Sequence, residues 1–326
     1  MKVLVIGGTV FVGRNAVEVA LERGDEVTLF NRGLHNADLF PDVPKLRGDR
    51  RADVSALEGT SWDVVIDTSA FQLEDVALVT KALAGSVERY VFVSSASVYR
   101  NWPAEPVDET SPVWKPGDGD NDYGIGKAQC EEAFEAAMPG RVIHARAAII
   151  TGPYENIGRL PYWLDRLSTY DDVIAPGSPD RSIQLLDARD LSNWMLVAAE
   201  AGSAGVYNVA GPPAVDTIGD LIDGVMAATG SSAKVEWVDD AFLLERGVEP
   251  WTELPLWLPP EGAEHGWNVP IDRAVETGLV NRPLADTIDG TWAWLEIDPS
   301  SEREPSPFTT LERSKEEELL REWTAS

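Results

Sequence analysis

A tyrosine and a lysine four residues apart form the most informative pair in this sequence of 326 residues. Tyr123 and Lys127 stand in the run Tyr123-Gly-Ile-Gly-Lys127, and residues four apart on a helix share one face. A free phenol has a pKa of about 10 and is a poor base at neutral pH, but a neighbouring ammonium favours its ionised form. The pair therefore predicts an acid–base centre in which Tyr123 exchanges a proton and Lys127 lowers the pKa of the phenol.

Three serines lie upstream of this pair, at the end of a predicted strand that covers Tyr90–Ser95. Ser95 is the residue that we expect to donate a hydrogen bond to a substrate carbonyl oxygen or alkoxide. Ser94 or Ser97 could take that role instead, and all three could simply satisfy backbone groups at the strand end. The position favours chemistry, because a doubly wound enzyme presents its reactive residues at the carboxyl ends of its strands.

A glycine-rich turn near the N-terminus predicts a dinucleotide-binding loop. Val3–Ile6 has the composition of a strand buried on both faces, and a helical pattern follows from Gly13 to Glu22. Gly7 permits a tight turn, Gly13 permits close packing of helix against strand, and the helix N-terminus offers free N–H groups to a pyrophosphate. The residues of this loop that we expect to contact the cofactor are Gly7, Thr9, Val10, Phe11, Val12 and Gly13.

The second predicted strand, Glu26–Phe30, bears on which dinucleotide binds. The residues after it, Asn31 and Arg32, include no acid to hold the ribose 2′-hydroxyl as NAD sites do. Arg32 could instead form a charge-assisted fork with a 2′-phosphate, which favours NADP over NAD, unless it is only a solvated loop arginine.

Two later segments are also expected to reach the cofactor. Asp49 follows a short predicted strand, Lys45–Arg47, and could accept a hydrogen bond from the adenine amino group or cap a local turn. The chain passes the cofactor again after the predicted strand Asp63–Thr68. The remaining predicted cofactor contacts are Asn31, Arg32, Asp49, Thr68, Ser69, Ala70, Tyr123 and Lys127.

The elements that carry these residues alternate between strand and helix over the first 150 residues. This rhythm predicts an α/β protein of the Rossmann type, with a doubly wound parallel sheet. After Thr151 prolines and tryptophans become frequent, which predicts a smaller, interleaved C-terminal substrate lobe. The predicted parts are a dinucleotide-binding domain (1–151 and 182–211), a substrate lobe (152–181 and 212–297), and a linker with a C-terminal helix (298–326).

The composition excludes several functions. The net charge of −28 repels phosphate backbones and anionic lipids, so neither a nucleic acid nor a membrane is an expected partner. No run of about 18 apolar residues predicts a membrane span, and the early first strand leaves no room for a signal peptide. Cys130 is the only cysteine, and no Cys/His cluster indicates a metal site. We therefore expect a cytoplasmic protein without a metal.

The Gly-rich loop, the Ser-Ser-Ala-Ser-Val-Tyr stretch and the Tyr-Lys pair, taken in order, resemble the extended short-chain dehydrogenase/reductase superfamily, also called the NAD-dependent epimerase/dehydratase family. The resemblance implies a Rossmann domain, a small substrate lobe and a catalytic centre of Ser95, Tyr123 and Lys127. The segments GGTVFVGR and LFNRG are similar to a divergent branch that includes chloroplast stem-loop-binding proteins.

The sequence departs from the pattern of this family at several positions. Val10 replaces the middle glycine of GxxGxxG. Asp67 stands where sugar epimerases usually have His, and Ile149 where they often have Asn. Arg181 is only an offset candidate for the arginine that grips a nucleotide diphosphate. These departures weigh against a nucleotide-sugar substrate.

The function that we expect is NAD(P)-dependent hydride transfer between the cofactor and a small carbonyl or alcohol. The alternatives are a nucleotide-sugar epimerase or dehydratase, and a non-catalytic NAD(P)-binding protein. Relatives that pair through a helix bundle suggest a homodimer. Aromatic and polar side chains could line a largely apolar substrate site, although most tryptophans are expected in the core. The candidate substrate residues are Phe71, Trp102, Tyr154, Arg159, Trp163 and Gln184.

Overall fold

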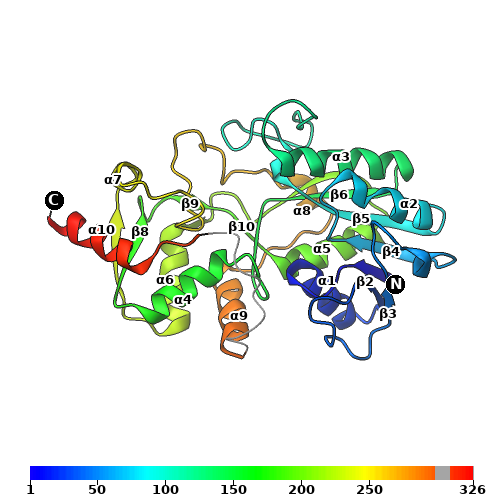
Figure 1. Ribbon diagram of the computed structural model, residues 1–326, viewed down its shortest axis with the longest axis horizontal. Coiled ribbons are helices and arrows are strands. Elements are labelled where there is room, and N and C mark those ends of the chain that lie inside the picture. Colours follow the sequence, from blue (N-terminus) through cyan, green and yellow to red (C-terminus); the bar gives the residue numbers. More distant parts are fainter. Residues whose placement is uncertain (298–308, 326) are drawn as a thin grey trace.

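The computed structural model describes residues 1–297 and 309–325. A seven-stranded sheet forms its larger half, with strand order β11-β6-β5-β4-β1-β2-β3, and every strand pair in it is parallel (Figure 1). This arrangement confirms the predicted α/β fold of Rossmann type. The strands are β1 (Lys2–Ile6), β2 (Glu26–Asn31), β3 (Lys45–Arg47), β4 (Trp62–Asp67), β5 (Val87–Ser95), β6 (Val142–Ala147) and β11 (Gly205–Val209).

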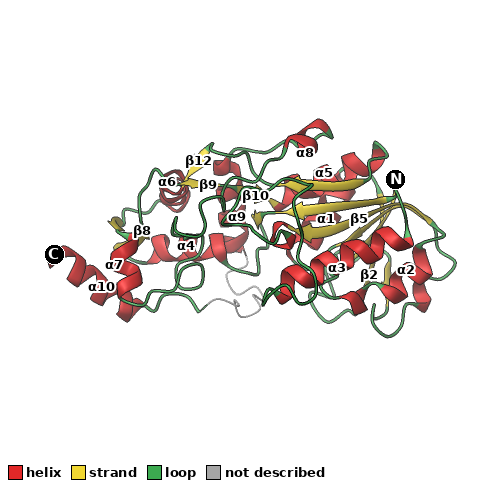
Figure 2. Cartoon of the chain, turned by 90° about the horizontal axis from the view of Figure 1, so that it is seen from above, coloured by secondary structure: helices red, strands yellow, loops and turns green. Residues whose placement is uncertain are grey.

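Helices cover both faces of this sheet (Figure 2). Val3 and Val5 of β1 pack in one core cluster with residues of α1 (Phe11–Glu22) and α5 (Ala188–Glu200). Leu4 and Ile6 point to the opposite face, into a cluster shared with α2 (Ala77–Leu83) and α3 (Asp122–Ala137). Because successive side chains of a strand alternate between faces, a strand buried on both sides must be apolar throughout, as β1 is.

The direction of winding reverses between β1 and β4. The chain runs from β1 outward through β2 and β3, and then returns to β4 on the other side of β1. Ile6 is paired in register with Asp67, so Gly7 and Thr68 leave the sheet side by side. In doubly wound sheets such a switch point, at the carboxyl ends of the strands, is where ligands bind.

A second core cluster forms the smaller half of the molecule. It includes the parallel pair of β8 (Asp172–Pro176) and β13 (Lys234–Val238). The helices that contribute to this cluster are α4 (Arg159–Thr169), α6 (Ile218–Thr229), α7 (Asp240–Glu245), α9 (Leu284–Ile297) and α10 (Arg313–Ala325). The remaining elements are β7 (Ile149–Thr151), β9 (Ser182–Ile183), β10 (Leu185–Asp187), β12 (Asp216–Thr217) and α8 (Asp272–Glu276). Over residues 1–297 and 309–325, none of the helices combines the length and apolar character needed to cross a membrane.

Two predicted elements are divided in the structure. The predicted helix over Leu73–Leu83 consists of a 3-10 turn, Leu73–Asp75, followed by α2. The Asp75 carboxylate turns back to accept the backbone N–H groups of Phe71 and Gln72, and so caps the start of the 3-10 turn. The predicted strand over Arg141–Ile150 is β6 followed by β7, which pairs with β10 outside the main sheet.

The proposed division of the chain into two domains stays a prediction, and most of its linker, at 298–308, lies outside the described residues. The predicted C-terminal helix is α10, and Glu316 attaches it to the smaller half. The buried Glu316 carboxylate forms an ion pair with Arg166 of α4 and accepts the backbone N–H of Ile174 in β8 at 3.0 Å. Arg313 binds the same carboxylate at 2.6 Å.

Removal of the Glu316 carboxylate should destabilise the protein. Glu316→Ala leaves the buried Arg166 guanidinium without its counter-charge, which costs about 3–5 kcal/mol in comparable buried pairs. Urea denaturation measures the loss, with Glu318→Ala, an exposed position on the same helix, as the matched control. Equal free energies of unfolding for the two variants would contradict this role.

Candidate active site

One face of α3 is joined residue by residue to the end of β5. The Lys127 ammonium donates to the carbonyl oxygen of Val93 at 2.8 Å, and one turn later Glu131 accepts from the Ser94 hydroxyl at 2.6 Å. One turn earlier, Tyr123 lies near enough to Ser95 for that side chain to act on the pKa of the phenol. The structure therefore brings together the three residues predicted as catalytic, at the carboxyl end of a central strand.

The two glycines between Tyr123 and Lys127 allow this close approach. A Cβ atom on Gly124 would lie 2.3 Å from the carbonyl oxygen of Ser97, and one on Gly126 would lie 2.4 Å from that of Phe71. Neither distance is compatible with a side chain, so any larger residue would push α3 away from Ser97, after β5, and from Phe71, in the loop after β4. The two glycines of the Tyr-Gly-Ile-Gly-Lys sequence thus set how closely α3 packs against its neighbours. The spacing of Tyr123 and Lys127 sets which face of the helix carries them.

Lys127 is buried, although it carries the charge of the centre. Its ammonium also donates to the carbonyl oxygen of Ala70 at 2.8 Å, and it lies 4.5 Å from the centre of the Phe71 ring and 5.8 Å from that of Tyr123. Burial lowers the pKa of Lys127 to about 8. Two of the three N–H groups of this ammonium therefore bind backbone carbonyls.

Tyr123 is an exposed residue of this centre. The residue is 44% exposed, yet desolvation raises the pKa of its phenol. The hydrogen bond from Ser95 and the positive charge of Arg159 act in the opposite direction. In the protein alone, the phenol therefore keeps its proton at neutral pH, as a proton donor requires.

A buried ion pair between α3 and β6 lies next to this centre. Arg146 of β6 binds both carboxylate oxygens of Glu131, with Nη2 at 2.6 Å from Oε2 and Nε at 3.0 Å from Oε1. The carboxylate raises the pKa of Arg146 against the effect of burial. Because Glu131 also holds Ser94, the pair links α3, β5 and β6 behind Ser95.

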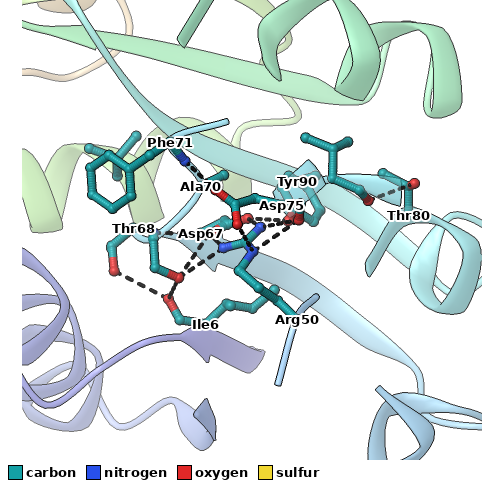
Figure 3. Close-up of polar contacts among 12 residues, drawn as sticks. Ile6, Arg50, Asp67, Thr68, Ala70, Phe71, Asp75, Thr80 and Tyr90 are labelled. Carbon is teal, nitrogen blue, oxygen red and sulfur yellow. Dashed lines mark hydrogen bonds and ion pairs between the residues drawn. The ribbon is translucent and has the colours of Figure 1, made fainter. Parts of the chain in front are cut away.

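A second buried cluster fixes the loop that covers Lys127 (Figure 3). Arg50 donates to both oxygens of Asp67, at 2.8 and 2.7 Å, and Tyr90 donates to Asp67 at 2.7 Å. Arg50 also donates to the backbone carbonyl of Asp75, the residue that caps Phe71. Despite desolvation, these partners lower the pKa of Asp67, and its charge raises that of Arg50. The loop that supplies Ala70 to Lys127 is thereby anchored to β4.

Sequence reasoning missed this cluster, although it noted Asp67 as a departure from the family. The only signal was the pair of arginines after the third strand, Arg50 and Arg51. Arg51 pairs with Asp75 at 2.6 Å, and the pKa of Asp75 is about 2. Desolvation opposes that lowering, and the hydrogen bond from Arg51 is its first cause.

The glycine-rich turn has the backbone that a pyrophosphate loop needs. Gly7 has φ +108°, and a Cβ there would lie 2.8 Å from the Thr68 hydroxyl oxygen. A Cβ on Gly13 would lie 2.7 Å from the backbone nitrogen of Gly8. Val10, in place of the middle glycine, has ordinary extended angles, and the strain falls on Phe11, with φ +34° at the first residue of α1.

Asn31, at the end of β2, joins the glycine-rich turn to the end of β3. Its amide donates to the Gly7 carbonyl at 2.8 Å, and its oxygen accepts from Arg47 and from the Gly33 backbone. Arg32 is exposed beside it. Arg47, which the sequence prediction did not include, lies against Gly33 from the end of β3. Other predicted cofactor residues have structural partners: the Thr9 carbonyl accepts from Asn36, and Ser69 accepts from Arg50.

Asp49 takes the alternative role considered for it. Its carboxylate accepts the backbone N–H of Arg51 at 2.9 Å, so it caps a local turn.

Three of the predicted substrate residues, Phe71, Tyr154 and Trp102, contact other side chains or backbone groups as follows. Phe71 lies beside Tyr123, with ring centres 6.4 Å apart. Tyr154 lies at α1, where the Arg14 guanidinium stacks on its ring at 3.5 Å. Trp102 donates to the His265 carbonyl at 3.2 Å and packs between core clusters.

Trp163 and Gln184 correct the prediction. Trp163 is fully buried and donates to the carbonyl of Pro255 at 2.9 Å. The buried Gln184 amide exchanges hydrogen bonds with the backbone of Val269 and donates to Gly211. Both side chains are committed to backbone groups in the core and not to a substrate.

Residues 3–210 match the model of the NAD dependent epimerase/dehydratase family. The chain belongs to this family. It is similar to the chloroplast stem-loop binding protein of 41 kDa b from Arabidopsis thaliana, with 27% identity over 228 residues, which cover 64% of this chain and 58% of that protein. A second curated relative, an uncharacterized protein of Sinorhizobium fredii, is 24% identical and is matched over 62% of its length. The chain thus spans less than two thirds of either relative.

Solved structures of this family share the fold. UDP-glucose 4-epimerase from Thermotoga maritima, with UDP-glucose, matches with a TM-score of 0.69 and 17% identity, over 92% of this chain and 100% of that one. The Bordetella bronchiseptica enzyme WbmH, in complex with NAD+, matches with a TM-score of 0.68 and 20% identity, over 94% and 99%. At these identities the likeness concerns the fold.

The burial of Lys127 predicts a distinctive dependence of stability on pH. Its pKa is about 8 in the folded protein and 10.5 as a free group, so between these values the unfolded chain binds more protons. The free energy of unfolding should therefore rise from pH 8 to pH 10.5, by on the order of 3 kcal/mol from this group. Urea denaturation across this range tests it against Lys127→Met, which should lack the rise. Parallel curves for the two proteins would refute the assignment.

Proposed function

We propose that this protein transfers hydride between a nicotinamide dinucleotide and a carbonyl or alcohol substrate. The observation that carries the proposal is the attachment of α3 to β5, which places Tyr123, Lys127 and Ser95 together at the carboxyl edge of the sheet. Membership of the NAD dependent epimerase/dehydratase family supports NAD-dependent activity.

The residues present fit a dinucleotide. The backbone turn Gly7–Gly13 leaves room where a Cβ would collide with Thr68 or Gly8, and the α1 N-terminus follows it. The remaining N–H of Lys127 would hold ribose hydroxyls. When bound, the nicotinamide supplies or accepts the hydride.

The protein's own residues would manage the proton. In the direction of reduction, the Tyr123 phenol donates its proton to the substrate oxygen while the Ser95 hydroxyl donates a hydrogen bond to it. The resulting phenolate is stabilised by the Lys127 ammonium, 5.8 Å from the ring centre. In the direction of oxidation the same phenolate takes the proton back.

Loss of the Tyr123 hydroxyl should slow the chemical step and leave dinucleotide binding unchanged. Tyr123→Phe is expected to lower kcat by about 10²–10⁴-fold, the usual contribution of a general acid or base, while the Kd for the dinucleotide stays unchanged. Steady-state kinetics and cofactor fluorescence read the two effects. Tyr170→Phe, which removes a hydroxyl from the smaller half, should do neither. Turnover retained in Tyr123→Phe would disprove the role.

We also propose that NADP is preferred to NAD. Asn31 brings no negative charge to the ribose, and Arg32 and Arg47 offer two guanidinium groups at the ends of β2 and β3. Charge-assisted hydrogen bonds to a 2′-phosphate would distinguish the two cofactors.

Removal of these guanidinium groups should erase the preference. Arg32→Ser and Arg47→Ser are each expected to weaken NADPH binding by about 10–100-fold, as the loss of a charged hydrogen bond does, and to leave NADH binding nearly unchanged. Titrations of cofactor fluorescence give both constants. Lys45→Ser controls for a simple change of net charge, since Lys45 of β3 binds the Ala37 carbonyl. Equal losses for NADPH and NADH would exclude a 2′-phosphate site.

A further inference from the structure

An exposed apolar side chain, Phe71, lies beside the proposed proton donor. Phe71 and Leu73 are each 46% exposed, in a segment held in place by the capping of Phe71 by Asp75 at 2.8 Å. Phe71 lies 6.4 Å from Tyr123, ring centre to ring centre, and also covers the Lys127 ammonium. An exposed phenyl ring next to a reactive group suits an apolar ligand. The ligand would cover the ring, and removal of both apolar surfaces from water is favourable.

The cation that acts on Tyr123 from the smaller half is already neutralised. Arg159, 8% exposed, pairs with Glu155 at 2.9 Å and donates to the Ile150 carbonyl. Glu155 is 0% exposed and also accepts the Arg159 backbone N–H at 3.0 Å. A diphosphate that bound Arg159 would have to displace this carboxylate or lie beside it, and an uncompensated buried charge is costly.

The other cations of the smaller half are similarly occupied. Arg181, the offset candidate for a diphosphate grip, forms an ion pair with Asp240, which also accepts from Trp257. Across residues 152–297 and 309–325, carboxylates also pair with Arg166, Arg189, Lys234, Arg246, Arg282, Arg313 and Lys315. The two described exceptions are Arg273, over the Tyr207 ring, and Arg321, bound to the Glu317 carbonyl. With a net charge of −28 around them, these groups offer a diphosphate little attraction.

We infer that the substrate is an uncharged, apolar carbonyl compound or the matching alcohol, and not a nucleoside-diphosphate sugar. Its apolar body would lie on the Phe71 ring, with its oxygen at Tyr123 and Ser95. This inference rests on the proposed function. In reduction, the carbonyl carbon gains a C–H bond by taking hydride from the reduced dinucleotide, which becomes oxidised, and the oxygen takes the Tyr123 proton.

Ligand binding tests the inference about the substrate, and turnover tests the proposed hydride transfer. Calorimetry on the protein–NADP+ complex compares acetophenone and 1-phenylethanol with UDP and UDP-glucose. We expect saturable binding of an aryl compound and none of UDP up to about 1 mM. Tighter binding of UDP than of the aryl compounds, or no aryl binding, would overturn the inference. Aryl binding without NADPH oxidation or NADP+ reduction would leave the apolar binding site standing, but would refute the proposed function and with it the identification of the aryl compound as a substrate.

The Phe71 ring gives the matched variants. Phe71→Ala should weaken aryl binding at least about tenfold through loss of apolar contact, with Phe71→Leu recovering part of the loss. NADPH binding should remain within about twofold of the wild-type value, which shows that the fold is intact. Val280→Ala, an exposed apolar position elsewhere, should change nothing. Equal aryl affinity in Phe71→Ala and wild type would overturn the placement on this ring.

Discussion

The buried ammonium of Lys127, held between the carbonyls of Ala70 and Val93, is the interaction on which the proposed site depends. A desolvated charge is tolerated only when its donors are satisfied, so two separate segments must stay where their carbonyl oxygens meet the helix. Gly126 lets α3 come close enough, and the pair of Glu131 and Arg146 holds the next helical turn against Ser94. The position of the Tyr123 phenol follows from this attachment.

The same requirement explains the cluster around Asp67. Ala70 can serve Lys127 only if the loop after β4 is rigid, and Arg50 supplies that rigidity by binding Asp67 and the backbone of Asp75 together. A net charge of −28 thus surrounds a buried ammonium, Lys127, which two backbone carbonyls hold at the carboxyl edge of the sheet.

Local patterns predicted what depends on neighbours in sequence. The turn at Gly7, the helix after it and the spacing of Tyr123 and Lys127 all follow from backbone geometry and helical period, and the parallel sheet follows from the alternation of elements. Contacts between distant residues were not predictable in this way: Arg50 meets Asp67 across 17 residues, and Glu316 meets Arg166 across 150. Trp163 and Gln184 were misplaced because a polar or aromatic side chain looks alike in a core and in a binding site until its backbone partners are known.

The titration of the Tyr123 phenol tests the central claim most directly. The difference in ultraviolet absorbance between wild type and Tyr123→Phe isolates this phenol, and its midpoint can be followed with and without NADP+. The account predicts a midpoint above that of free tyrosine in the protein alone, because of desolvation. It predicts a fall of more than about one pH unit on addition of NADP+, since the cationic ring joins the Lys127 ammonium, and a smaller fall in Lys127→Met. A midpoint that does not move when NADP+ binds would contradict it.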